Sequence, residues 1–242
     1  MSKPRFEDEF GGTYILIEPG IFSMGDLVGD GLARELPAHK VQIDRPFFIG
    51  QRPVTQIHWE SVMGFNPSKF QEGWSSGLRP VDSISHIDCM EFINRLNQSF
   101  NKPQLSVDGI WRLPTEAEWE YCARSGTDTK WCFGNFDGDL DDYGWHAGNS
   151  GASTREVGLK KSNNWEIFDI YGLISEWCLD NYRNDYTTPS KQSPYTSDSD
   201  IYCVRGGSWF TESDSTRSSA RSHAKQDKTS DGIGLRLVWE PL

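Results

Sequence analysis

The side chains best suited to redox or metal chemistry in this sequence are five cysteines and five histidines. Thiolates act as nucleophiles and bind soft metals such as Cu(I), and imidazoles bind zinc, copper and iron. The cysteines form no CxxC pair, and an odd number cannot all be joined within one chain. The histidines lack an HxxxH or HxxE arrangement on a plausible helix. We therefore expect reduced, mostly buried thiols and isolated imidazoles.

A second group of reactive and polar side chains lies near the C-terminus, in residues 205–239, which contain no cysteine. Residues 211–231 offer hydroxyls, carboxylates, amides and cations, a composition typical of a recognition surface or a solvated loop. The tryptophan that precedes them could stack on a ligand or fill the core. We expect the ligand-facing residues to be Trp209, Thr211, Glu212, Ser213, Asp214, Ser219, Arg221, His223, Gln226 and Asp227. Alternatively, Arg217, Arg221 and Arg236 hold loops together by binding carboxylates or backbone carbonyls.

Short strands are predicted at both ends of the chain. The sequence TYILIEPGIFSMG alternates apolar and polar residues around a proline and a glycine, which predicts a hairpin over residues 13–25. The stretch HKVQIDRPFFIG repeats the strand pattern, and IYCVRGGSW and GIGLRLVW predict further strands near the C-terminus. Clusters of Gly, Asp, Asn, Ser and Pro after residue 126 predict long ordered loops, which are more often functional than idle.

Three helices are predicted between residues 55 and 126. Their N-caps are Thr55, then Ser85 or Asp82, then Thr115, which forms a capping box with Glu118. The expected apolar faces are Ile57, Val62 and Met63 in the first helix, Ile87, Met90, Ile93 and Leu96 in the second, and Ala117, Trp119, Tyr121 and Cys122 in the third.

Length and charge narrow the class of protein. The 242 residues contain no linker or repeat, so we expect a single domain over residues 1–242. A net charge of −11 would repel a polyphosphate backbone, which argues against nucleic acid as a partner. There is no apolar run near the ~20 residues that span a bilayer and no signal-peptide core at the start. We therefore expect a cytoplasmic protein that does not associate with a membrane.

Seven motifs in order carry a resemblance to a known family. They are FSMG (22–25), MGFNPSKF (63–70), RPVDSIS (79–85), WRLPTEAEWEYCAR (111–124), FDIYGLISEWC (168–178), VRGGSW (204–209) and RSSAR with GIGLRLV (217–238). Together these motifs resemble the sulfatase-modifying-factor domain of the formylglycine-generating enzymes, over most of the chain. The resemblance implies an α+β, C-type-lectin-like fold with little regular secondary structure and long ordered loops, in which loops and C-terminal strands form the binding face.

The sequence departs from the catalytic members of that family at their reactive cysteines. Those members carry two cysteines shortly after the GGS element, which bind copper and oxidise a substrate cysteine to formylglycine. Here the corresponding stretch has Thr211, Ser213 and Ser215, and a hydroxyl cannot replace a thiolate as a Cu(I) ligand. Cys203 precedes RGGSW in a predicted strand and is expected to be a buried thiol. We therefore expect neither copper nor formylglycine-generating activity.

Two other branches of the family bear on function. The iron-dependent sulfoxide synthases of thiohistidine biosynthesis need an additional helical domain with a histidine cluster, for which this chain has no room, so we expect no iron. The variable proteins of diversity-generating retroelements change their ligand by mutation of a C-terminal segment that ends in a GFRL-type strand. GIGLRLV is similar to such an ending, which non-diversified members share, so the motif does not separate the two.

A structural calcium ion is also implied by the resemblance. YGLISEW (171–177) is similar to the family's GNxWEW turn, where backbone carbonyls and a glutamate, here Glu176, hold calcium. This chain has Leu173 where the family usually has asparagine. Asn149, by the same analogy, is a candidate ligand for another cation. Both side chains could instead fill buried hydrogen-bonding roles.

Two functions from different classes follow. The favoured one is a non-catalytic module that binds a protein or small-molecule ligand through its C-terminal polar surface. The alternative is a metal-dependent oxidoreductase of the formylglycine-generating type, or an accessory enzyme of peptide or natural-product biosynthesis.

Overall fold

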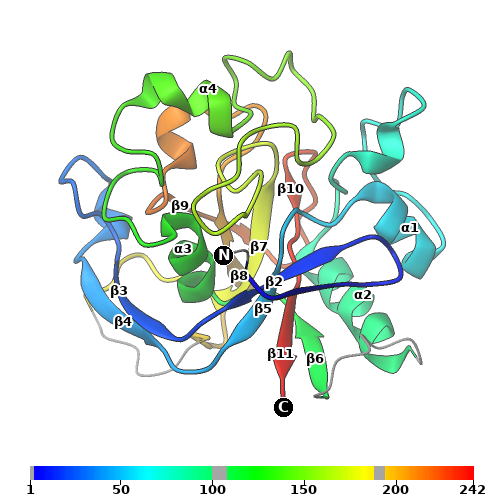
Figure 1. The fold of residues 1–242 in the computed structure, drawn as a ribbon, viewed down its shortest axis with the longest axis horizontal. Coiled ribbons are helices and arrows are strands. Elements are labelled where there is room, and N and C mark those ends of the chain that lie inside the picture. The colour runs from blue at the N-terminus through cyan, green and yellow to red at the C-terminus, as the bar shows by residue number, and fades with distance from the viewer. Residues whose placement is uncertain (1–2, 100–107, 188–193) are drawn as a thin grey trace.

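A computed structural model describes residues 3–99, 108–187 and 194–242. It is a mixed α+β structure in which short elements alternate with long loops (Figure 1). The strands are β1 (Arg5–Glu7), β2 (Thr13–Ile17), β3 (Gly20–Met24), β4 (His39–Ile43), β5 (Phe47–Gly50), β6 (Gly109–Arg112), β7 (Ser175–Asn181), β8 (Ile201–Arg205), β9 (Arg221–Lys225), β10 (Ile233–Gly234) and β11 (Val238–Pro241). The helices are α1 (Gln56–Met63), α2 (His86–Gln98), α3 (Glu116–Arg124) and α4 (Leu140–Tyr143), with 3-10 turns η1 (Ala33–Glu35), η2 (Ser76–Leu78), η3 (Asp137–Asp139) and η4 (Ser213–Thr216).

The described strands form three sheets. One has the order β1-β2-β5-β11-β6 and brings the two ends of the chain together. A second has the order β10-β7-β8-β9, so that β9 lies at its edge, and β3 pairs only with β4 in a third. The predicted hairpin over residues 13–25 is therefore wrong in its pairing, although both strands exist. β2 pairs with β1 and β5, because the chain turns away at Pro19 and sends β3 to another sheet.

The three predicted helices and their N-caps are confirmed. The hydroxyls of Thr55, Ser85 and Thr115 each accept a hydrogen bond from the backbone N–H three residues on. In the last two helices Asp88 and Glu118 complete capping boxes.

The apolar faces of the first two helices differ from the prediction. In α2, Ile87 and Met90 are 51% and 40% exposed, and the buried face is Cys89, Phe92, Ile93 and Leu96. Steps of three residues fall about 60° short of a full helical turn, so a run of three such steps ends on the opposite side of the helix. In α1, Trp59 turns inward and stacks on Phe92, with ring centroids 4.8 Å apart, which leaves Ile57 half exposed.

Helix α3 holds the two halves of the molecule together. It contacts β3 and β4 on one side and β7 and β8 on the other, whereas α2 packs against β6 and α1 packs against α2, on the right of Figure 1. Ala117, Trp119 and Cys122 are buried as predicted, and Tyr121 is partly buried. Three glutamates of α3, Glu116, Glu118 and Glu120, are buried as well. Their burial was not predictable from local sequence, because a buried carboxylate needs a partner, which here lies elsewhere in the chain.

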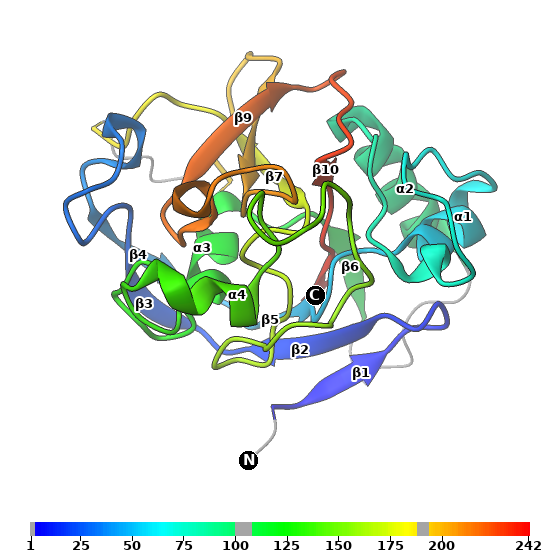
Figure 2. The ribbon, with the colours of Figure 1, turned by 90° about the horizontal axis from the view of Figure 1, so that it is seen from above.

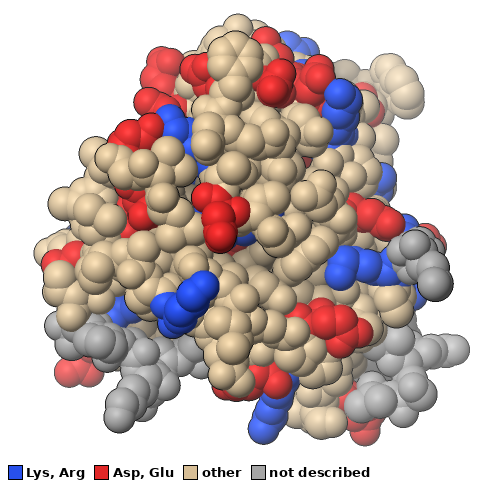
Figure 3. All heavy atoms as spheres, turned by 60° about the vertical axis from the view of Figure 1, so that its left-hand side comes forward, with Lys and Arg blue, Asp and Glu red and all other residues tan. Residues whose placement is uncertain are grey.

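The expected long loops are present, and residues 144–174 contain no helix or strand. Figure 3 shows the face that includes the left-hand side of Figure 1, where acidic side chains gather along the upper edge and basic ones are scattered singly. Within the described ranges, no helix is long and apolar enough to cross a membrane.

Candidate functional site

A pocket of about 240 Å³ lies at the C-terminal surface, and we call it the C-terminal pocket. Ser175, Val204 and Ser222 reach it from β7, β8 and β9. Its other walls are the segment that carries η1 and the segment that carries η4, which lie near each other in Figures 1 and 2. The lining residues are Asp30, Leu32, Arg34, Glu35, Ser175, Val204, Gly206, Gly207, Thr211, Asp214, Ser215, Arg217, Ala220, Arg221 and Ser222.

The pocket contains hydroxyl side chains from the segment that follows the GGS turn. Thr211 and Ser215 both line it. The Thr211 hydroxyl closes the turn after β8, because it accepts from the backbone N–H of Ser208 at 2.9 Å. Gly207 has a φ of +69°, and a Cβ there would approach the Thr211 hydroxyl to 2.8 Å, so this turn requires glycine. Neither hydroxyl can supply the soft thiolate that Cu(I) prefers.

Beneath the pocket, Arg217 binds Glu35 of η1. Two hydrogen bonds of 2.7 and 3.0 Å join the guanidinium to the carboxylate, and the hydroxyl of Ser219 donates a third at 2.8 Å. Burial raises the pKa of Glu35, but the hydrogen bonds from Arg217 and Ser219 outweigh it and hold that pKa below its usual value. The carboxylate therefore stays charged and ties the two walls of the pocket together.

Arg221 and Arg205 bind the glutamates of α3. Arg221 donates to Glu116 at 2.6 and 2.9 Å, and to the carbonyls of Arg34 and Arg183. Arg205 pairs with Glu120 and lies 3.4 Å from Glu116. These side chains are almost completely buried. The arginines thus act as the partners that the buried glutamates of α3 require.

Glu176 has an arginine as its counter-ion. Arg236 donates to both of its carboxylate oxygens at 2.7 to 3.0 Å, and the indole N–H of Trp119 donates at 2.7 Å. A calcium ion at Glu176 would have to displace Arg236. Leu173 has a φ of +63°, a left-handed conformation that asparagine adopts more readily, which accounts for the family's preference there.

Asn149 caps a surface turn. Its amide oxygen accepts from the backbone N–H of His146 at 2.9 Å, and its amide nitrogen donates to Asp141 and to the carbonyl of Gly144. Across the residues described, no group of three or more His, Cys, Asp or Glu side chains is arranged to hold a metal ion.

All five cysteines are buried as free thiols. Burial raises the pKa of every one of them, to about 11 for Cys132 and well above the ordinary value for Cys89, Cys122, Cys178 and Cys203. A thiol must ionise to act as a nucleophile, so none is poised to attack near neutral pH. The expectation of buried, reduced thiols, Cys203 in β8 included, is confirmed.

The predicted surface residues divide into two groups. Glu212, Asp214, His223 and Asp227 are exposed, and Trp209, Thr211, Ser213 and Gln226 are partly buried. Ser219 and Arg221 are 5% and 2% exposed, and their side chains bind Glu35 and Glu116, although Arg221 also lines the C-terminal pocket. The structural alternative for Arg217, Arg221 and Arg236 is the one that the structure supports.

Sequence reasoning missed the part of the pocket that comes from the N-terminal third. Asp30 and Arg34 line it, and so do Ser175 and Ser222. No local signal marks Asp30 or Arg34, because they reach the site only when Glu35 binds Arg217 across the pocket. Ser222 follows Arg221 on β9 and pairs in register with Val204 of β8, which also lines the pocket.

Comparisons with known proteins agree with this fold. Variable protein 1 of Treponema denticola has a solved structure that matches with a TM-score of 0.87 at 27% identity, over 99% of both chains. Chaperone protein LppX of Paenibacillus barcinonensis is 26% identical over 79% of each sequence. The formylglycine-generating enzyme of Streptomyces coelicolor is 26% identical over 90% of this chain and 86% of its own length.

The C-type-lectin-like fold and the relation to formylglycine-generating enzymes are thereby confirmed. The family model described as the sulfatase-modifying factor enzyme 1-like domain matches residues 4–241, nearly the whole chain. This protein therefore belongs to the sulfatase-modifying factor enzyme 1-like family.

Proposed function

We propose that this protein is a non-catalytic binding module that holds a protein or small-molecule ligand at its C-terminal pocket. The observation that carries the proposal is the lining of that pocket, where Thr211, Ser215 and Asp214 stand in the region that follows the GGS turn. Hydroxyls and a carboxylate form hydrogen bonds with many ligands, but they supply no redox chemistry.

The electrostatics of the pocket support an uncharged or cationic ligand rather than nucleic acid. Its arginines Arg217 and Arg221 are neutralised by Glu35 and Glu116. Asp214 is exposed at the rim, and Asp30, which is also a lining residue, pairs with Lys130. Arg34 is the lining arginine that has no ion pair within the described residues, and the overall charge of −11 opposes the approach of a long phosphate backbone to it.

The likeness to variable protein 1 of Treponema denticola supports a binding role for the same face. That protein matches this chain from end to end, and its name describes it as variable. In the present chain, the side chains at the rim of the pocket have little packing to preserve. We infer that Glu212, Asp214, Ser222 and His223 form the replaceable part of the surface, which sets the choice of ligand.

Affinity capture with paired variants tests the proposal. Three chains are immobilised: the wild type, the double variant Asp214→Arg/Ser222→Trp, and the control variant Lys161→Glu. Each is exposed to lysate of the source cells, and the proteins and metabolites that it retains are compared by mass spectrometry. The proposal expects ligands that the wild type and the control retain and the double variant loses. Identical retention by all three chains would contradict it. Equal thermal unfolding of the three shows that the fold is intact.

A further inference from the structure

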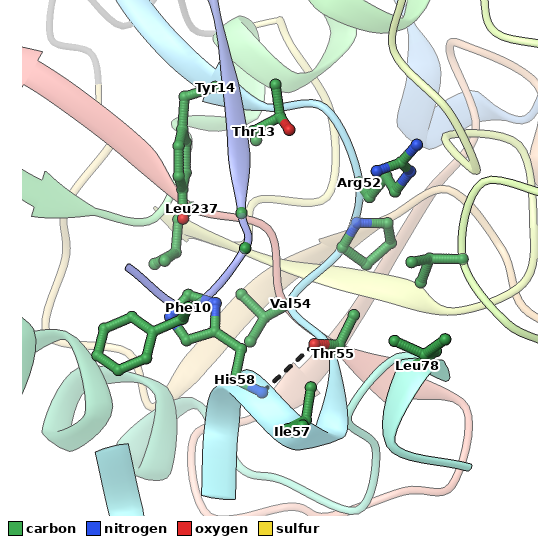
Figure 4. A pocket seen from close by; sticks show the side chains of 15 residues that line it. Phe10, Thr13, Tyr14, Arg52, Val54, Thr55, Ile57, His58, Leu78 and Leu237 are labelled. Carbon is green, nitrogen blue, oxygen red and sulfur yellow. Dashed lines mark hydrogen bonds between the residues drawn. The ribbon is translucent and has the colours of Figure 1, made fainter. Parts of the chain in front are cut away.

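A second pocket lies on another part of the molecule, and we call it the N-terminal pocket. Its volume is about 190 Å³. One wall is the chain before and at the start of β2, a second comes from residues 50–58, and Leu78 of η2 and Val157 form a third (Figure 4). It shares no lining residue with the C-terminal pocket. The two pockets are therefore separate sites.

The walls of the N-terminal pocket are mainly apolar. Val54 and Leu237 form buried parts of it, at 4% and 1% exposure. Ile57 and Leu78 are 52% and 47% exposed. Val157 completes the lining and is fixed to Leu78 by a backbone hydrogen bond of 3.0 Å. Half-exposed aliphatic side chains of this kind would be covered by a bound apolar group.

A buried imidazole without a partner lines one side of this pocket. His58 is 3% exposed, and its Nε2 has no hydrogen-bond partner among the residues that the structure describes. The nearest carboxylate oxygen, on Asp8, is 3.9 Å away and already accepts from the hydroxyl of Tyr14 at 2.7 Å. Burial lowers the pKa of His58 to about 4, so the ring is neutral and offers both a donor and an acceptor.

Across the pocket from His58 lies an arginine, as Figure 4 shows. The guanidinium of Arg52 lies over the ring of Phe168, 5.3 Å from its centroid. It also packs against Gly158, where a Cβ would come within 2.4 Å of the Arg52 Nε. In the described part of the chain no carboxylate lies within ion-pair distance of Arg52, although most other arginines of this acidic protein have one.

We propose that the N-terminal pocket binds a small organic carboxylate with an apolar body of roughly six to eight carbons. An apolar cavity of about 150 Å³ accommodates benzene, so the present volume fits a body of this size. The carboxylate binds Arg52, which pairs readily with such groups. The body lies between Val54, Ile57 and Leu78, and its far end reaches His58.

Binding of defined probes to the full chain tests this site. Hexanoate and phenylacetate are titrated into protein labelled at its histidine side chains, with hexanol as the uncharged counterpart of hexanoate. His58→Gln assigns the His58 resonances. We expect saturable shifts of the His58 resonances with both carboxylates, no shift at His223, and at least tenfold weaker binding of hexanol.

Two variants make the outcome decisive. Arg52→Gln removes the charge at an exposed position and should weaken hexanoate binding at least tenfold without a change in thermal unfolding. Arg45→Gln, at an exposed arginine outside the N-terminal pocket, should leave the binding unchanged. Equal binding of hexanol and hexanoate, an unaffected Arg52→Gln, or no saturation by about 10 mM probe would each overturn the proposal.

Discussion

The C-terminal segment contains two sets of polar residues, one exposed at the rim of the C-terminal pocket and the other buried in the interior. Asp214 is exposed at the rim of the C-terminal pocket, and Arg217, three residues later, is 5% exposed and bound to Glu35. On β9, Arg221 is buried and binds Glu116. His223, two residues later, is exposed, and one face of its ring stacks on Tyr182. Position relative to the buried glutamates, rather than polarity, decides which residues can take part in recognition.

The difference has a physical basis in the cost of an unpaired buried charge. Each buried arginine satisfies a carboxylate that would otherwise be isolated from water, so the two residues depend on each other. The rim residues contact water, which replaces any hydrogen bond that a substitution removes. The interior region therefore constrains the fold, and the rim tolerates substitution more readily.

The largest expected effect comes from breaking a buried pair. Arg221→Met removes the main partner of Glu116 and should lower the free energy of unfolding by about 3 to 5 kcal/mol. Urea denaturation followed by tryptophan fluorescence measures this loss. The double variant Arg221→Met with Glu116→Met should lose less than the single one, because no buried charge is left alone. A loss below about 1 kcal/mol in the single variant would remove the distinction between interior and rim.

The pH dependence of the free energy of unfolding also distinguishes the interior from the rim. His86 is buried, its Nε2 donates to the carbonyl of Cys178 at 3.2 Å, and burial lowers its pKa from 6.5 to about 4. Because the pKa of His86 is lower in the folded than in the unfolded chain, the unfolded chain takes up the proton at a higher pH as the solution is acidified. The stability that neutral His86 contributes is therefore complete above pH 6.5 and decreases as the pH falls towards 4, by up to roughly 3 kcal/mol.

Denaturation curves at several pH values check this expectation. His86→Phe keeps an aromatic ring beside Tyr202, whose ring centroid lies 3.7 Å from that of His86. The variant should reduce the slope between pH 6.5 and 4, and the part that remains includes the contribution of His58, whose pKa burial also lowers to about 4. His223→Phe at the rim should preserve most of that slope. If the two variants change the slope equally, burial does not separate these histidines.

The smallest effect belongs to the rim itself. Glu212→Gln and Asp214→Asn keep the shape of exposed side chains and should each change the free energy of unfolding by no more than about 0.5 kcal/mol. The same urea assay measures them. A loss of 2 kcal/mol or more, on the order of a lost buried interaction, would show that the rim is structural.

The sequence predicted local features well and long-range partners poorly. The N-caps at Thr55, Ser85 and Thr115 were predictable because each is a contact within three residues. The pairing of β3 with β4 and the burial of Glu116 were not, since both depend on segments distant in the chain. The absence of cysteine from the C-terminal segment was visible at once, but the contribution of Asp30 and Arg34 to the pocket appeared only in three dimensions.

A copper titration tests the central claim most directly. The purified protein is titrated with Cu(I) against a chromophoric chelator, and oxygen consumption is followed with a cysteine-containing peptide present. If the protein is the proposed binding module, with hydroxyls in its pocket and five buried thiols, it should retain no stoichiometric copper and consume no oxygen. One copper per chain, with oxygen consumption that Thr211→Ala or Cys203→Ser abolishes, would contradict the account and restore the oxidoreductase alternative.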